Sequence, residues 1–146
     1  MQPTLSVRQG TIEEVVAASR CLPEFSEPYG AVEYQKRLGG KRHLILVAVA
    51  QNRVVGFKVG YEREETFYSW MGGVLPAFRR QGVATVLAEA QEEWVRQQGF
   101  SSILLKTRNC HRDMLIFALK RDFQITGMIP KETIGQSRIW LQKTFD

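Results

Sequence analysis

Residues 72–90 have the sequence GGVLPAFRRQGVATVLAEA, which predicts a strand, a turn and a helix in succession. The strand pattern ends at Val74, and Pro76 falls in the turn that follows. From residue 80 to residue 98 the apolar side chains recur at helical spacing, and Gly99 ends the pattern. A helix that begins here leaves several backbone N–H groups without intrahelical partners. These groups make the helix start the first candidate for a binding site.

The start of this helix has the composition of an anion site. The dipoles of unpaired N–H groups sum to a partial positive charge, which attracts phosphate. Gly82 would let a ligand approach the backbone, and Arg79 and Arg80 add mobile positive charge. The chain has neither the G-x-x-x-x-G-K-[ST] loop of nucleoside triphosphate sites nor the G-x-G-x-x-G loop of dinucleotide sites. A phosphate cradle of a third type is therefore expected over residues 79–85.

The rest of the chain alternates strand and helix patterns. Thr11 and Glu14 form a capping box at the first helix, and Glu92 and Arg96 are spaced for an outward-facing ion pair on a later one. Strands are expected over residues 4–10, 43–50, 54–62, 66–74, 101–107, 123–129 and 137–145, and helices over residues 11–20, 30–38, 80–98 and 112–122. This order predicts a single mixed α/β domain over residues 1–146.

Length and composition place the chain among soluble globular proteins. Its 146 residues suffice for one core, and 44% of them are hydrophobic. The longest apolar run, residues 44–50, is far shorter than the roughly 20 residues of a membrane-spanning helix. The amino-terminal residues show no export signal, so a cytoplasmic location is expected. Cys21 and Cys110 lack the spacing of a zinc site or a disulfide framework, so no metal is expected.

The charge balance allows more than one kind of partner. The net charge is +5, but the basic residues are scattered and no aromatic-and-basic stacking motif is present. A modest basic excess suits a small anionic ligand as well as nucleic acid. Because no stacking motif and no long apolar run is present, neither nucleic acid nor a membrane is an expected partner.

A resemblance to a known family rests on residues 79–84, Arg-Arg-Gln-Gly-Val-Ala, which match the pattern [RQ]-x-x-G-x-[GA]. In the GNAT acyltransferases a strand–turn–helix with this pattern holds the pyrophosphate of acyl-coenzyme A. The Val74–Pro76 strand ending and the sequence LKRDF at residues 119–123 lie at the spacing of that family. The chain thus resembles the GNAT family over nearly its whole length. The resemblance implies a central mixed, mostly antiparallel sheet of about six or seven strands, flanked by about four helices.

The resemblance implies acetyl-CoA as the acyl-donor co-substrate. Its pantetheine arm would bond like an added strand to the backbone near Gly72 and Gly73, where a bulge would point an N–H at the thioester oxygen. Tight packing against a neighbour is the alternative role of this glycine pair. The implied cofactor-binding residues are Gly72, Gly73, Val74, Arg79, Arg80, Gln81, Gly82, Val83, Ala84, Thr85 and Asn109.

The reaction implied is direct attack of a primary amine on the thioester through a tetrahedral intermediate. Many family members use a tyrosine of the last helix as the acid, but Ala118 occupies that position here. His111 replaces an asparagine that often contacts pantetheine, for which Asn109 could substitute, and Lys106 replaces a glutamate that is the base in some members. Tyr68 occupies the position of the fourth-strand glutamate base of the histone-acetylating branch. The usual proton-transfer groups are therefore missing, and Tyr68 is the first candidate to replace them.

Tyr68 has a second interpretation, as a half-buried aromatic side chain of the strand. Glu64 is the other candidate for proton transfer. It stands with Glu62 and Glu65 in an acidic cluster that could act through water, attract a cationic acceptor, or simply be solvated charge. His111 could titrate near neutral pH, although a histidine at a helix start is more often a cap or a surface residue.

The acceptor is expected opposite the cofactor, along a wall of Phe25, Tyr29, Tyr68 and Trp70. Such a wall suits a small amine or a peptide end, in a protein expected to be a monomer or a homodimer. One alternative is a non-catalytic acyl-CoA-binding module, which the loss of the tyrosine acid and of the strand glutamate favours. The other is a nucleic-acid-binding domain, whose binding would fall steeply with salt and ignore coenzyme A.

Overall fold

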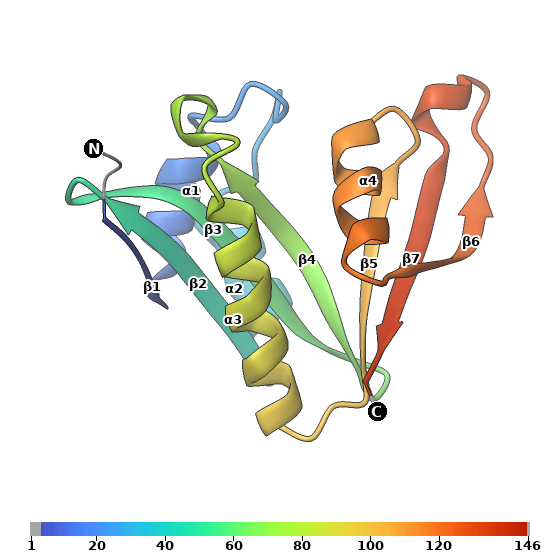
Figure 1. Ribbon diagram of the computed structural model, residues 1–146, viewed down its shortest axis with the longest axis horizontal. Helices are drawn as coiled ribbons and strands as arrows, with labels where there is room; N and C mark the ends of the chain where they lie inside the picture. The colour runs from blue at the N-terminus through green and yellow to red at the C-terminus, as the bar shows by residue number, and fades with distance from the viewer. Residues whose placement is uncertain (1–3, 146) are drawn as a thin grey trace.

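The computed structural model describes residues 4–145, which form one seven-stranded sheet with four α-helices (Figure 1). The strands are β1 (Leu5–Gln9), β2 (His43–Ala50), β3 (Arg53–Arg63), β4 (Thr66–Val74), β5 (Ser102–Arg108), β6 (Gln124–Ile129) and β7 (Arg138–Thr144). The helices are α1 (Ile12–Ser19), α2 (Ala31–Leu38), α3 (Val83–Gln97) and α4 (Arg112–Lys120), with short 3-10 turns at Pro76–Phe78 and Ile134–Gln136. Every element expected from the sequence is present.

The sheet has the strand order β1-β2-β3-β4-β5-β7-β6. All neighbouring strands pair antiparallel except β4 and β5, which confirms the mixed, mostly antiparallel sheet. The parallel pairing is short and joins Phe67–Ser69 to Ile103–Leu105. Beyond it the two strands diverge and the sheet opens like a V (Figure 1). Past Ser69 the edge of β4 that faces β5 therefore has no strand partner, and we call this divergence of the two strands the gap.

Helices cover the two arms unequally. Helices α1 and α2 lie behind the first four strands, whereas α3 lies in front of them and α4 in front of β5 (Figure 1). Glycine makes the close approach of α3 feasible, because a Cβ at Gly56 would come within 2.8 Å of Val83 and 3.2 Å of Leu87. Within residues 4–145, the rear face of β5, β7 and β6 has no covering helix (Figure 1).

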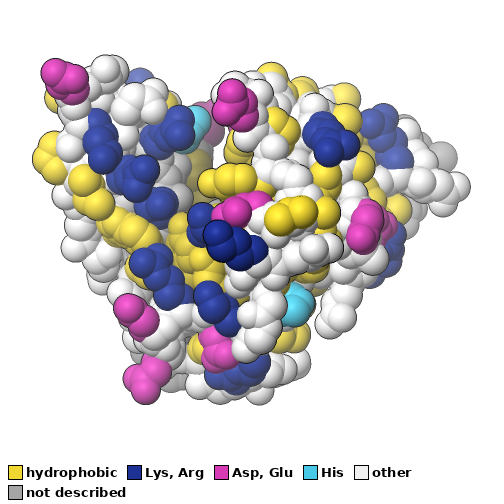
Figure 2. All heavy atoms as spheres, turned by 180° about the vertical axis from the view of Figure 1, so that it is seen from behind, with side chains coloured by type: hydrophobic (Ala, Val, Ile, Leu, Met, Phe, Trp, Pro, Cys, Tyr) yellow, Lys and Arg dark blue, Asp and Glu magenta, His cyan; other side chains and the backbone are white. Residues whose placement is uncertain are grey.

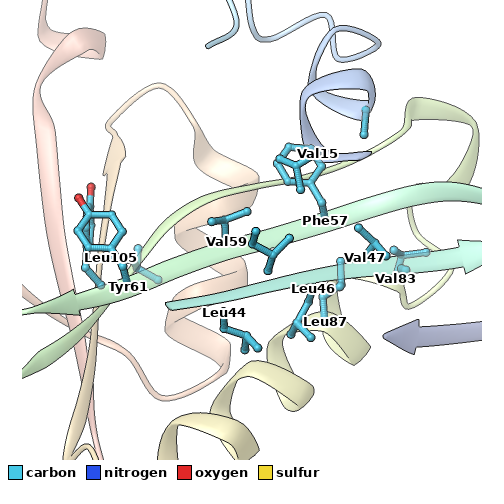
Figure 3. Close-up of a cluster of buried hydrophobic side chains, with 14 of the residues drawn as sticks. Val15, Leu44, Leu46, Val47, Phe57, Val59, Tyr61, Val83, Leu87 and Leu105 are labelled. Carbon is cyan, nitrogen blue, oxygen red and sulfur yellow. The ribbon is translucent and has the colours of Figure 1, made fainter. Parts of the chain in front are cut away.

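The core lies mainly in the first arm, where the sheet is covered on both sides. Phe57, Val15 and Val59 are almost wholly buried, and Leu87 of α3 packs from the other face (Figure 3). Burying such side chains stabilises the fold by about 1.5–3 kcal/mol each. Strand β6, at the opposite edge, leaves Ile125 56% exposed. Stability is therefore concentrated in the arm that precedes the gap.

Helix α3 begins at Val83, three residues later than its apolar spacing predicts. Arg80 and Gly82 adopt the left-handed conformation, with φ of 63° and 84°. A residue in that conformation cannot continue a right-handed helix, and it is strained for arginine but not for glycine. The turn is therefore a defined structure of its own rather than the first turn of the helix.

The strand bulge lies at Trp70, so the expectation of a bulge at Gly72 and Gly73 was wrong. The β3–β4 register shifts there, leaving Trp70 as an extra residue, whereas both glycines pair regularly. The alternative of close packing holds for Gly73, because a Cβ there would overlap the side chain of Leu22. The ring of Trp70 packs against that of Tyr34, with centroids 4.9 Å apart.

The expected outward pair of Glu92 and Arg96 was also wrong. Glu92 is only 8% exposed, and its carboxylate accepts hydrogen bonds from Arg121 at 2.8 Å and from Lys143 at 2.7 Å. Burial by itself raises the pKa of Glu92, but the hydrogen bonds from Lys143 and Arg121 outweigh it and hold the pKa below its ordinary value. Long-range partners thus replace the local one, and they join α3 to the second arm of the sheet.

Candidate active site

The turn before α3 has the geometry of an anion cradle. Within the described part of the chain, none of the N–H groups from Arg80 to Thr85 donates to a backbone carbonyl. Gly82 caps the helix, and a Cβ built there would meet no atom within 4 Å. The glycine is therefore needed for its backbone angle, and the space beside it is open. A phosphate could occupy this space and accept hydrogen bonds from several of the free N–H groups.

The two arginines of the turn have different surroundings. Arg79 donates from Nε to the carbonyl of Val74 at 3.0 Å, and its guanidinium contacts both carboxylate oxygens of Glu24 at 2.8 and 2.9 Å. It ties the turn to the loop after α1. Arg80 is exposed and makes no hydrogen bond or ion pair within residues 4–145. The positive charge free to meet a ligand is thus that of Arg80.

The glycine pair borders the gap between the two arms. Gly72 and Gly73 pair with Lys58 and Phe57 on the β3 side, but beyond Ser69 strand β4 has no partner on its β5 side. An unpaired strand edge offers backbone groups to an extended ligand, as when a peptide adds a strand to a sheet. An extended molecule could therefore pair with this edge of β4 while its anionic end lies at the turn before α3.

Lys58 occupies a position that the sequence analysis did not single out. It lines a small cavity of about 10 Å³ between β3, α3 and α4, together with Ser69 and Ala118. Burial lowers the pKa of Lys58 to about 8, while the charge of Glu92 raises it and that of Arg121 lowers it. One signal in the sequence could have identified it, since Lys58 is the sole charged residue of the buried run VVGFKVG at 54–60.

Tyr68 lies on the face of β4 opposite to Ser69 and the cavity of Lys58. It is 4% exposed, and its ring meets Tyr61 edge-on at 5.6 Å and Trp140 at 6.0 Å. Burial raises the pKa of Tyr68, the neighbouring Tyr61 raises it further, and Arg63 lowers it in part. A hydroxyl with a raised pKa is a poor base at neutral pH but can pass a proton along.

The acidic cluster in the β3–β4 turn separates into two parts. Glu62 accepts hydrogen bonds from Arg42, at 3.1 Å from the backbone N–H and 3.3 Å from Nε. Glu64 and Glu65 form the turn itself, with φ of 49° and 68°. Glu64 lines an open groove of about 350 Å³ that also includes Trp140. Of the three carboxylates, Glu64 is thus the one placed beside a groove on the face of Tyr68.

The expected acceptor wall is largely assembled. Tyr29 stacks on Trp70 with ring centroids 5.7 Å apart, and Trp70 approaches Tyr61 at 5.9 Å, which in turn meets Tyr68. Phe25 is half-buried and packs against the core. These rings form a continuous row on the rear face of β3 and β4.

The residues near the start of α4 are arranged less as expected. Asn109 donates from its side chain to the carbonyl of Ile134 at 3.5 Å, so part of its capacity is already used. His111 is the N-cap residue, but its side chain makes no capping hydrogen bond and is exposed. Ala118 is buried beside the cavity of Lys58.

No described helix is long and apolar enough to cross a membrane.

The chain belongs to the acetyltransferase (GNAT) family, whose model matches residues 13–123. No curated protein sequence matches the chain. The family match includes the turn before α3, the gap between β4 and β5, and α4. It identifies the family, whereas the acceptor has to be inferred from the site.

Solved structures share the fold at low sequence identity. The ribosomal-protein-S18-alanine N-acetyltransferase from Escherichia coli matches with a TM-score of 0.83 and 12% identity, covering 97% of this chain and 94% of that one. Ard1 from Thermoplasma volcanium matches with a TM-score of 0.82 and 21% identity, covering 97% and 98%. The PaiA N-acetyltransferase from Thermoplasma acidophilum, in complex with coenzyme A, matches with a TM-score of 0.74 and 15% identity, covering 97% and 99%.

Proposed function

We propose that this protein is an N-acetyltransferase that moves an acetyl group from acetyl-CoA to a primary amine. The observation that carries the proposal is the turn from Arg80 to Thr85, with its free N–H groups and open space at Gly82, placed next to an unpaired edge of β4. Membership of the GNAT family supports it. So do fold relatives solved with coenzyme A or acetyl-CoA.

The cofactor would lie along the turn and the gap. Its pyrophosphate would accept hydrogen bonds from the backbone between Gln81 and Thr85, with Arg80 adding charge. The pantetheine arm would pair with β4 from Gly72 to Val74. A backbone N–H at the gap would stabilise the oxyanion formed when the amine attacks the thioester. Arg79, held by Glu24, would keep the cradle in shape. Asn109, which follows β5, would approach the pantetheine from the other side of the gap.

Proton transfer is the second part of the proposal. A primary amine is mostly protonated at neutral pH, so it must lose a proton before attack. The rear face of β3, β4, β5 and β7, which carries Tyr68, Trp70 and Trp140, would be the acceptor face. The raised pKa of Tyr68 suits a relay through water better than a base. Glu64, at the groove on the same face, is the carboxylate that could receive the proton.

A non-catalytic acyl-CoA-binding module is the alternative function. It is favoured by Ala118 and Lys106, which stand where other GNAT proteins place an acid and a base. Turnover separates the two functions, because both predict coenzyme A binding. The direct test is mass spectrometry of a mixed amine panel incubated with acetyl-CoA and the protein. An acetylated amine that requires the protein supports the transferase, whereas coenzyme A binding by calorimetry without any product supports the module.

A further inference from the structure

The rear face of β5 and β7 collects cations. Side chains two residues apart on a strand share a face, so Lys106 and Arg108 point the same way. Trp140 lies directly opposite Lys106, and Arg138 directly opposite Arg108. Figure 2 shows basic side chains along a hollow on this side of the molecule, with hydrophobic side chains between them. The cations thus line the edge of the acceptor face rather than being scattered.

These cations have few acidic partners. Like charges directly opposite one another destabilise a sheet, and Arg108 and Arg138 form such a pair. Burial lowers the pKa of Lys106, and four arginines lower it further, in the order Arg138, Arg63, Arg37 and Arg108. Within residues 4–145 only Arg37 of this group forms an ion pair, with Glu33 at 2.9 Å. Positive charge without a counter-charge is therefore concentrated on this face.

Aromatic rings hold Arg63 and Lys106 in place on the rear face of the sheet. The guanidinium of Arg63 lies 5.3 Å from the Tyr68 ring and 5.5 Å from the Trp140 ring. The amine of Lys106 lies 5.3 Å from the Trp140 ring. Cations over aromatic faces keep a defined position instead of extending into solvent. Arg63 therefore lies beside Tyr68, and Lys106 lies on the far side of this pair, over Trp140.

We propose that the acceptor amine also carries an anionic group, a carboxylate or a phosphate, which Arg63, Lys106 and Arg138 bind while the amine reaches Tyr68. This inference rests on the proposed transferase function. A polyamine or a lysine-rich peptide would meet like charge here, and such juxtaposition disfavours binding. Glu64 lines an open groove with Arg63 and Trp140, and it can pair with the ammonium end of such an acceptor.

The test uses matched acceptors that differ in charge. The first pair compares phenylalanine with phenylalaninamide. The second pair compares two amidated peptides, one with acidic residues after its amino terminus and one with lysines at the same positions. We expect kcat/KM to favour the anionic member at least about tenfold at low salt, and less at high salt. The first pair reports a free amino acid and the second a peptide end. Tryptophan fluorescence measures binding of the same compounds, since Trp70 and Trp140 line the face.

A double variant locates the preference. In Lys106→Gln/Arg138→Gln the preference should fall to near unity, whereas Lys36→Gln/Lys120→Gln, which removes the same charge from exposed helical positions, should retain it. Equal or better use of the neutral and cationic members by the parent protein would overturn the inference while the transferase function stands. Coenzyme A binding with no acetylated product would instead refute the transferase, and fluorescence binding would then decide the anion preference alone.

A separate observation concerns the cavity beside Ala118. Lys58 lies opposite Gly72 in the sheet, and its Cγ would be 3.8 Å from a Cβ on that glycine. The cavity also includes Ser69, the last residue of β4 that pairs with β5, and therefore ends where the gap begins. The charged groups that face it are Glu92 of α3 and Arg121 after α4. The Lys58 side chain thus lies beside the end of the β4–β5 pairing, on the side away from Tyr68.

We infer that Lys58 is the acid that protonates the departing thiolate, replacing the tyrosine that Ala118 lacks. As the carbon–nitrogen bond forms and the carbon–sulfur bond breaks, the Lys58 ammonium gives one proton to sulfur and later regains one from water. The acceptor nitrogen loses its proton on the opposite face, by way of Tyr68. Because burial lowers the pKa of Lys58 to about 8, turnover should decline above about that pH.

Nuclear magnetic resonance of lysine-labelled protein tests this without relying on activity. The Cε resonance absent from Lys58→Met should titrate near 8, instead of the usual value of about 10.4, and should shift when coenzyme A binds. In assays, Lys58→Met should lose about 10²-fold in kcat with little change in KM for acetyl-CoA, and should lose the alkaline decline. Adding Ala118→Tyr should partly restore kcat.

The outcomes separate a catalytic role from a structural one. Lys120→Met, at an exposed position of α4, should match the parent in every measurement. A Lys58 resonance that ignores coenzyme A, or a Lys58→Met protein with the parent pH profile, would overturn the inference and leave the transferase function in place. If Lys58→Met does not fold, the response of the parent resonance to coenzyme A decides.

Discussion

The turn before α3 is built from consecutive residues, Arg80 to Thr85, whereas the acceptor face draws on β3, β4, β5 and β7. The turn depends on backbone angles and free N–H groups that one glycine sets locally. The acceptor face depends on register, because it exists only if Lys106 lies opposite Trp140 and Arg108 opposite Arg138. A local site should thus respond to single residues near it, and an assembled site to anything that moves a strand.

Strand β4 connects the two sites, so its packing should give the largest effect. Phe67 is fully buried against Trp94 and Phe100, and its ring fills the space above Gly60. Phe67→Ala should lower the free energy of unfolding by about 3–5 kcal/mol, measured by urea denaturation. Ile125→Ala on the exposed edge strand is the control, with an expected loss below about 1 kcal/mol. Equal losses would show that both arms are packed alike.

The link between the two arms should come next. Glu92 is enclosed by Arg121 and Lys143, so Glu92→Gln leaves two cations without their counter-charge and should cost about 3 kcal/mol at neutral pH. The folded-state pKa of Glu92 lies below its ordinary value. Its contribution is therefore complete above the unfolded pKa of about 4.3 and is lost as pH falls through the folded value. Unfolding curves of parent and variant should converge in acid; a constant difference would contradict this.

On the acceptor side, Tyr68→Phe removes only a hydroxyl and keeps the ring contacts. It should reduce turnover by about 10²-fold while the affinity for coenzyme A is unchanged, because the cradle lies on other residues. Ala118→Tyr in that background is the control: it adds an acid beside Lys58, on the face away from Tyr68, and should therefore leave the loss in place. If Tyr68→Phe matches the parent from about pH 6 to 9, Tyr68 is a wall residue, and the proton must pass by Glu62, Glu64, Glu65 or His111.

The cradle should respond in the opposite way, through binding. Gly82→Asp places bulk and negative charge in the space open to phosphate, and should weaken coenzyme A binding by at least about 2 kcal/mol in calorimetry. Gly82→Asn is the matched control, because asparagine tolerates the left-handed angle and carries no charge. Unchanged affinity in a folded Gly82→Asp protein would remove the cradle from the proposal.

The smallest effect is expected at the brace of the turn. The Arg79–Glu24 pair is partly exposed, so Glu24→Gln should lower the free energy of unfolding by less than about 1 kcal/mol. It also frees Arg79. If Arg79 binds phosphate, coenzyme A affinity should rise a few-fold in the variant, whereas unchanged or weaker binding would make Arg79 a support of the turn only. Calorimetry at low salt distinguishes the two.

Periodicity and turn chemistry in the sequence predicted every strand and helix, because these signals act over a few residues. The glycine at position 82 also marked the cradle before any fold was known, since only local angles and free N–H groups are needed there. Acetyl-CoA binding and the roles of Tyr68 and Glu64 in proton transfer remain predictions that the experiments above address.

Tertiary structure alone decided where the buried charges lie. Glu92 has the spacing of a surface residue, yet it is buried because α4 and β7 bring Arg121 and Lys143 to it. The bulge falls at Trp70, whose ring packs against Tyr34 of α2, and not at either glycine. Helical and strand spacing fix which face of its own element a side chain takes. What covers that face, and whether a charge there meets water, a partner or a cavity, depends on residues distant in sequence.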